Sequence, residues 1–255
     1  MINKNNLYFI VILFIGILLA SGCININSES EINTYTYPVQ PGTDEWKSIS
    51  GHDEMVAVCR IPDDILKNLS TSGLIDTILN YPLYGDMRAY NTLQQGFSAM
   101  SSQFNGFQEL YNRQDAGEKL IEKYRSLDPA AIDADWSLIQ KGDYDWSIQN
   151  IEVLLVQDAI QDKLNDTQKA NLLQEAIAKY RTKLQYGEVY SKYSQQTSLW
   201  LAGRTLQNLK YEPFVKTMES DISLQDFLNN GSFPDESDLK EILLKADTYL
   251  TSISP

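Results

Sequence analysis

The segment IQNIEVLLVQDAIQDKL, Ile148–Leu164, decides the fold class of this chain. Its apolar residues fall on two faces of a helix. One face contains Ile148, Ile151, Leu155 and Ala159, and the other contains Val153, Val156, Ile160 and Leu164. A helix that is apolar on both sides is usually buried between layers. The segment therefore predicts a central helix, packed by the helices before and after it.

Apolar residues recur at helical spacing in three further regions. The stripes are Tyr90, Leu93, Phe97, Met100 and Phe104 on a helix from about Asp86; Leu172, Leu173, Ala176, Ile177, Tyr180 and Leu184; and Leu239, Ile242, Leu243, Ala246 and Leu250. Intervals of three and four residues place each set on one helix face. Asn165 and Gln168 predict a capping pair at the start of the second helix. Asp235 or Ser237 is expected to cap the third.

Shorter helices complete an all-α fold. They are expected at Asp63–Leu69, Gly73–Asn80, Phe107–Arg113 and Gly117–Ser126. No run of alternating β-branched residues between turn signals predicts a strand. Prolines and glycines separate the helices, which favours helical pairs stacked in sequence order. We expect residues 46–255 to form a single all-helical domain, an irregular array of α-hairpins.

The N-terminus resembles an export signal. The run from Leu7 to Ala20 has no charged residue and follows Lys4. As a helix it spans about 21 Å, short of the roughly 30 Å hydrocarbon core of a bilayer. This length is typical of a signal peptide rather than of a permanent membrane helix. Residues 1–22 are therefore interpreted as a signal peptide.

Leu19-Ala20-Ser21-Gly22-Cys23 resembles the lipobox of prokaryotic lipoproteins. The resemblance implies a diacylglycerol on Cys23 and a protein anchored in the cell membrane on the extracytoplasmic side. An aliphatic residue is usual where Ala20 stands, and Ala20-Ser21-Gly22 also fits an ordinary signal peptidase site. Both interpretations cut before Cys23. Residues 23–45 are polar and broken by prolines, so they predict a flexible tether.

Charge and cysteine content exclude several classes of function. The chain has 34 acidic and 21 basic residues, a net charge of −13, which argues against nucleic acid and anionic lipid as partners. With Cys23 lipidated, Cys59 is the one remaining thiol, and its apolar neighbours predict a buried structural residue. His52, the single histidine, could share a helix face with Cys59 as a catalytic pair. It is more simply a solvated residue at a helix start.

A six-residue pattern occurs at Asp133–Leu138 and again at Asp143–Ile148. The candidate ligand-binding residues in it are Asp133, Asp135, Trp136, Asp143, Asp145 and Trp146. Carboxylates beside a tryptophan could contact a cation or a sugar. The other ligands of a calcium loop are missing, so we expect no metal. Alternatively, the second Asp of each copy caps a helix and the Trp packs in its first turn.

Enzyme signatures are absent from the sequence. It contains no Gly-rich phosphate loop, nucleophile elbow, HExxH motif or cysteine cluster, so we expect no cofactor and favour a non-catalytic protein.

The stretch Ile61–Gly117 resembles a family of helical bacterial proteins without an established activity. The recognisable elements are Leu74–Pro82, Gly85-Asp86, Tyr90-Asn91, Phe104-Asn105-Gly106 and Glu109-Leu110. The resemblance implies a shared helical fold and transfers no catalytic residue.

Two functions follow from these observations. The first is a lipid-anchored helical domain that binds or scaffolds an envelope protein without doing chemistry. It predicts an exposed apolar or aromatic patch. The second is a small-ligand or carbohydrate-interacting protein that uses Trp136, Trp146 and nearby carboxylates. It predicts a concave pocket into which those side chains converge.

Overall fold

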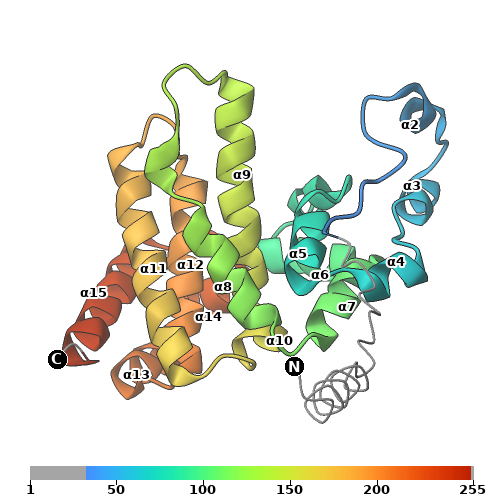
Figure 1. Cartoon of the computed structure of the whole chain (residues 1–255). Helices are drawn as coiled ribbons and strands as arrows, with labels where there is room; N and C mark the ends of the chain where they lie inside the picture. Colours follow the sequence, from blue (N-terminus) through green and yellow to red (C-terminus); the bar gives the residue numbers. More distant parts are fainter. Residues whose placement is uncertain (1–32, 254–255) are drawn as a thin grey trace, which may run out of the picture. The chain divides into compact units, whose positions relative to one another are not determined.

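Helix α9, Leu138–Leu155, ends in a fully buried segment. Figure 1 shows where this helix lies among its neighbours. The structure is a computed structural model, and it describes residues 33–253. Every residue from Ile148 to Leu155 is buried, and α9 packs against α8, Ala116–Ser126, and α12, Lys192–Asn208. The predicted central helix is therefore confirmed. It is shorter than expected, because α9 ends before Val156 and Ala159 lies exposed in the separate helix α10, Asp158–Gln161.

The regular secondary structure of the described residues is helical, and no strand occurs among them. The remaining helices are α2 Asp44–Ser48, α3 His52–Val58, α4 Asp63–Asn68, α5 Thr71–Leu79, η1 Tyr84–Ala89, α6 Leu93–Gln103, α7 Asn105–Asn112, η2 Pro129–Ala131, α11 Asp166–Gln185, α13 Glu212–Ser220, α14 Ile222–Asn230 and α15 Glu236–Ile253. The four short helices predicted from residue 63 to residue 126 correspond to α4, α5, α7 and α8. Within residues 33–253, no helix combines the length and the apolar character needed to cross a bilayer.

Helices α11 and α12 form the most extensive pair, and α15 packs against both (Figure 1). The start of α11 confirms the predicted capping pair. The Asn165 side chain accepts from the Gln168 backbone N–H at 2.9 Å, and the Gln168 side chain accepts from the Asn165 N–H at 3.0 Å. At the start of α15, Asp235 lies at the predicted N-cap position, and its backbone N–H donates to the carboxylate of Asp238 at 3.0 Å. Ser237, the alternative cap, lies inside the helix.

Helix α6 begins later than predicted. Tyr90 is 50% exposed and lies outside the helix, which Thr92 caps by accepting from the Gln95 backbone N–H. The other members of the predicted stripe are buried. Leu184 of the second stripe is also exposed, at 48%, in the last turn of α11.

Close packing fixes η1 against α6 at Gly96. A Cβ built on Gly96 would lie 1.8 Å from the carbonyl oxygen of Met87. Only a residue without a side chain lets the two backbones approach this closely. This contact also fixes Arg88, the next residue of η1, beside α6.

The folded domain begins earlier than residue 46. Tyr35 donates its backbone N–H to the Thr77 hydroxyl at 3.0 Å, and Tyr37 donates its hydroxyl to the Thr77 carbonyl at 3.0 Å. Tyr37 is buried and lies near the rings of Tyr81 and Phe104. The backbone of Tyr35 and the side chain of Tyr37 thus attach the end of the predicted tether to the folded domain. The signal region, Cys23 and residues 23–32 lie outside the described residues.

Candidate functional site

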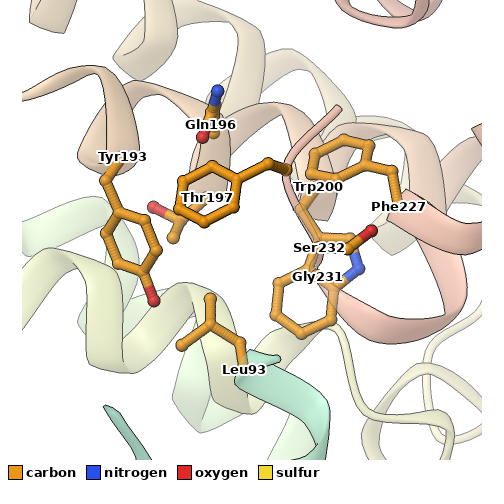
Figure 2. A pocket seen from close by; sticks show the side chains of 9 residues that line it. Leu93, Tyr193, Gln196, Thr197, Trp200, Phe227, Gly231 and Ser232 are labelled. Atoms are coloured by element: carbon orange, nitrogen blue, oxygen red, sulfur yellow. The ribbon is translucent and has the colours of Figure 1, made fainter. Parts of the chain in front are cut away.

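An aromatic pocket lies where α6, α12, α14 and the loop after α14 meet. Its lining residues are Leu93, Tyr193, Gln196, Thr197, Trp200, Phe227, Gly231, Ser232 and Phe233. Figure 2 shows Tyr193 and Trp200 on opposite sides, with Leu93 between them. Its inner part is narrow, with about 10 Å³ of free space, roughly what one water molecule needs.

The loop after α14 is held in place by Gly231 and Trp200. Gly231 ends α14 in the left-handed conformation, with φ of 60°, which glycine adopts without strain. A Cβ on Gly231 would lie 3.1 Å from both Leu93 and the Trp200 ring. The Trp200 indole N–H donates to the Leu228 carbonyl at 2.8 Å. These contacts place Ser232 and Phe233 over the pocket.

The pocket continues into a wider outer chamber of about 280 Å³. The chamber shares Leu93, Tyr193, Gly231, Ser232 and Phe233 with the inner part and adds residues from η1 and the turn before α6: Met87, Arg88, Tyr90, Asn91 and Thr92. Its volume is near the lower end of small-molecule sites, roughly 300–1,000 Å³. Phe233 is 79% exposed at its rim, so an apolar surface is open to a ligand.

Arg88 supplies a positive charge with few partners. Its Nη2 donates to Gln149 Oε1 at 3.4 Å and to Asn150 Oδ1 at 3.5 Å, which are long distances for such bonds. Its Nη1 is buried and has no hydrogen-bond partner. Among residues 33–253 no carboxylate forms an ion pair with it. The guanidinium lies 4.2 Å from the centre of the Trp146 ring, a cation–π contact.

Burial lowers the pKa of Arg88, and the neighbouring Tyr193, Tyr84 and Asp145 act in the opposite direction. Burial raises the pKa of Tyr193, and the positive charge of Arg88 acts to lower that pKa. Arg88 and Tyr193 are therefore close enough to affect each other. Both line the outer chamber. A guanidinium and a phenol hydroxyl at one wall are the donors that an anionic group requires.

A buried polar network lies behind the pocket, between α8, α9, α11 and α12. The carboxylate of Glu152 pairs with Lys183 at 3.0 Å, and both side chains are fully buried. Glu152 also accepts hydrogen bonds from the hydroxyls of Tyr124, Ser198 and the pocket residue Thr197. A charge buried this deeply persists only when it is paired and hydrogen-bonded. The network is enclosed and positions α12, so we assign it a structural role.

Asp145 belongs to the same buried region. Its carboxylate accepts a short hydrogen bond from the Ser194 hydroxyl of α12. Burial raises the pKa of Asp145, while the bonds from Ser194 and Gln149 and the charge of Lys183 oppose this. Asp145 therefore links α9 to α12 at the position just before Trp146, which contacts Arg88.

The structure separates the six candidate residues of the repeated pattern. Asp133, Asp135 and Asp143 are exposed, while Asp145 is buried. Trp136 packs edge-on against Tyr144, at 5.5 Å between ring centres, and Trp146 packs on Arg88. The aromatic pocket is lined by none of the six. The carbohydrate hypothesis for these residues stays a prediction.

The proposed capping role of the aspartates was wrong. Ser137 caps α9 in a capping box with Gln140, whereas Asp145 lies within the helix. Asp133 instead accepts from the backbone N–H of Asp135 at 2.9 Å. Ser137 is the cap because it is the last non-helical residue, and its short side chain reaches the backbone N–H of the N3 residue.

Cys59 and His52 do not form a pair. Cys59 is fully buried, as predicted, and burial raises the pKa of its thiol to about 11. His52 begins α3 and its Nε2 lies 2.8 Å from Asp86 Oδ2. In the described part of the chain, no three His, Cys, Asp or Glu side chains gather as metal ligands would.

Sequence analysis missed Arg88, Tyr193 and Phe233, because they come from distant segments. The Glu152–Lys183 pair was also missed, although the sequence indicated that Glu152 needs a partner. Glu152 stands in an apolar run that is buried on both faces, so its charge required a partner. Compared with protein-family models, with curated proteins and with solved structures, the chain gives no match.

Proposed function

We propose that this protein is an exported, lipid-anchored helical protein whose domain acts as a non-catalytic binding module at the aromatic pocket. The observation that carries the proposal is the chamber of about 280 Å³ that combines aromatic walls with one under-coordinated arginine. Small-molecule sites typically have such mostly apolar walls with few polar groups. The occupant comes from the cell envelope, where the export signal would deliver the protein.

The anchor rests on the sequence Leu19–Cys23 and on the acidic composition, which disfavours attachment to anionic lipid by charge. A diacylglycerol on Cys23 would hold the domain on the extracytoplasmic side through residues 24–32. Within the domain, consecutive helices in contact, α11 with α12 and α13 with α14, support the description as an irregular array of α-hairpins.

Binding at the pocket is tested with indole, a neutral water-soluble aromatic compound. The full-length protein in lipid nanodiscs is titrated by calorimetry, and empty nanodiscs provide the background. We expect saturable binding that Phe233→Ala weakens. Leu244→Ala, an exposed apolar residue of α15 outside the pocket, is the matched control and leaves binding unchanged. Binding that survives Phe233→Ala, or no binding, would reject the pocket as the site.

Anchoring is tested by feeding cells a clickable fatty acid. The wild-type protein should be labelled, and Cys23→Ser should lose the label and release the domain from the membrane. Cys59→Ser keeps the lipidation site and serves as the control. Equal labelling of the wild type and Cys23→Ser would refute lipidation at this residue. An unlabelled wild type would favour an ordinary signal peptidase site.

A further inference from the structure

We propose that the outer chamber binds a monocarboxylate attached to a flat apolar body, with the carboxylate on Arg88 and Tyr193. This inference rests on the proposed binding function and specifies its ligand class. A ligand with this carboxylate and ring could be a free aromatic acid or the C-terminal aromatic residue of an envelope protein.

The carboxylate assignment follows from Arg88. A guanidinium has five N–H donors and forms its strongest bonds in pairs with carboxylates. Here Nη1 has no partner and Nη2 has two long bonds to neutral amide oxygens. In the region that the structure describes, the charge has no ion-pair partner, although the protein is strongly acidic. Such a poorly satisfied charge is costly unless a ligand completes it.

A single negative charge fits better than two. Arg88 is the one cationic side chain among the residues that line the outer chamber. Sites for phosphate usually combine several cationic groups or backbone N–H donors. The chamber therefore suits a monocarboxylate rather than a phosphate.

The apolar body follows from the aromatic rings. Tyr193 and Phe233 lie 6.4 Å apart between ring centres, tilted by 54°, and Tyr90 lines the same chamber. Phe233 and Tyr90 are exposed at 79% and 50%, so burial against a ring would gain apolar contact for both. The Tyr193 hydroxyl has no protein partner among residues 33–253 and is free to donate to the carboxylate beside Arg88.

The test compares indole-3-acetate with its neutral isostere indole-3-acetamide on the full-length protein in nanodiscs. We expect indole-3-acetate to bind about tenfold more tightly, the size of effect typical of one charged hydrogen-bonded pair. Arg88→Gln should remove this preference, and Arg88→Lys should restore part of it. Arg181→Gln on α11, which removes an exposed ion pair with Asp247 of α15, is the matched control and should keep the preference.

The outcomes separate this inference from the proposed function. Equal binding of acid and amide, both weakened by Phe233→Ala, would overturn the carboxylate assignment and leave the pocket as the binding site. Preference for the acid that survives Arg88→Gln would also overturn it. Tighter binding of N-acetyltryptophan than of indole-3-acetate would support a protein C-terminus as the source, and the reverse order would support a free acid.

Discussion

The two copies of the repeated pattern, Asp133–Leu138 and Asp143–Ile148, share both aspartates, the tryptophan and the serine, and they lie in opposite environments. The first copy is a turn that contains Ser137, the N-cap of α9, and ends at Leu138, the first residue of that helix, whereas the second copy lies wholly inside the helix. Leu138 is 87% exposed, whereas the equivalent Ile148 is fully buried. Asp135 is exposed, whereas Asp145 is buried and bonded to Ser194.

This difference shows that a short pattern does not determine its own surroundings. Ten residues along an α-helix are about 2.8 turns, so equivalent residues of two helical copies would point roughly 80° apart. The first copy precedes the helix, and the helices α8 and α12 cover only the second. Environment is decided by which helices pack on each copy.

The largest expected difference between the copies is in the aliphatic residue. Ile148→Ala removes a fully buried side chain and should lower the free energy of unfolding by about 2–5 kcal/mol. Leu138→Ala removes an exposed one and should change it by less than about 0.5 kcal/mol. Urea unfolding measures both. Similar losses in the two variants would contradict the buried position of Ile148.

The serines should differ in the opposite order. Ser137→Ala removes the N-cap of α9 and should cost about 1 kcal/mol. Ser147 donates its hydroxyl only to the Asp143 carbonyl within the helix, so Ser147→Ala should be close to neutral. Urea unfolding of both variants tests this, and an equal effect would show that the capping box contributes nothing.

The tryptophans should differ in their effect on Arg88. Trp146→Leu removes the ring under the guanidinium and should cost about 0.5–1 kcal/mol from that contact. Trp136→Leu removes an edge-on contact with Tyr144 and leaves Arg88 unaffected. The side-chain nitrogen signals of Arg88 in NMR spectra should therefore shift in the first variant. If both variants shift them equally, the pairing of Trp146 with Arg88 is wrong.

The smallest difference concerns pH. Burial raises the pKa of Asp145, so the folded protein binds this proton more tightly than the unfolded chain does. Its contribution to stability is complete at low pH and is lost as the pH rises through the raised pKa. Asp145→Asn has no such titration. The free energy of unfolding of this variant should therefore rise relative to that of the wild type as the pH is raised from about 4 to about 7.

The matched variant for that experiment is Asp135→Asn, which changes an exposed carboxylate of the first copy. Denaturant unfolding at the two pH values gives the difference for each variant. A gain of the same size in Asp135→Asn would show that burial of Asp145 is not its cause.

Local signals predicted much of the secondary structure. Asn165 and Gln168 cap α11 as expected, because a capping box depends on four consecutive residues alone. The spacing of apolar residues likewise located α5, α7 and α8. Predicted helix bounds were wrong where a neighbouring residue determines the start of the helix. Tyr90 continues the apolar spacing of α6, yet Thr92 starts the helix two residues later and leaves Tyr90 in the pocket wall.

The sequence by itself determined that the domain is helical, that its central helix lies within Ile148–Leu164 and that Cys59 is buried, since periodicity and polarity are local properties. The structure limited that helix to residues up to Leu155. Only the tertiary structure decided the pocket. Arg88, Tyr193 and Phe233 are far apart in the chain, and the approach of η1 to α6 at Gly96 and the turn at Gly231 bring them together. No local sequence pattern predicts that these three residues lie close together, because their positions depend on how several helices pack against one another.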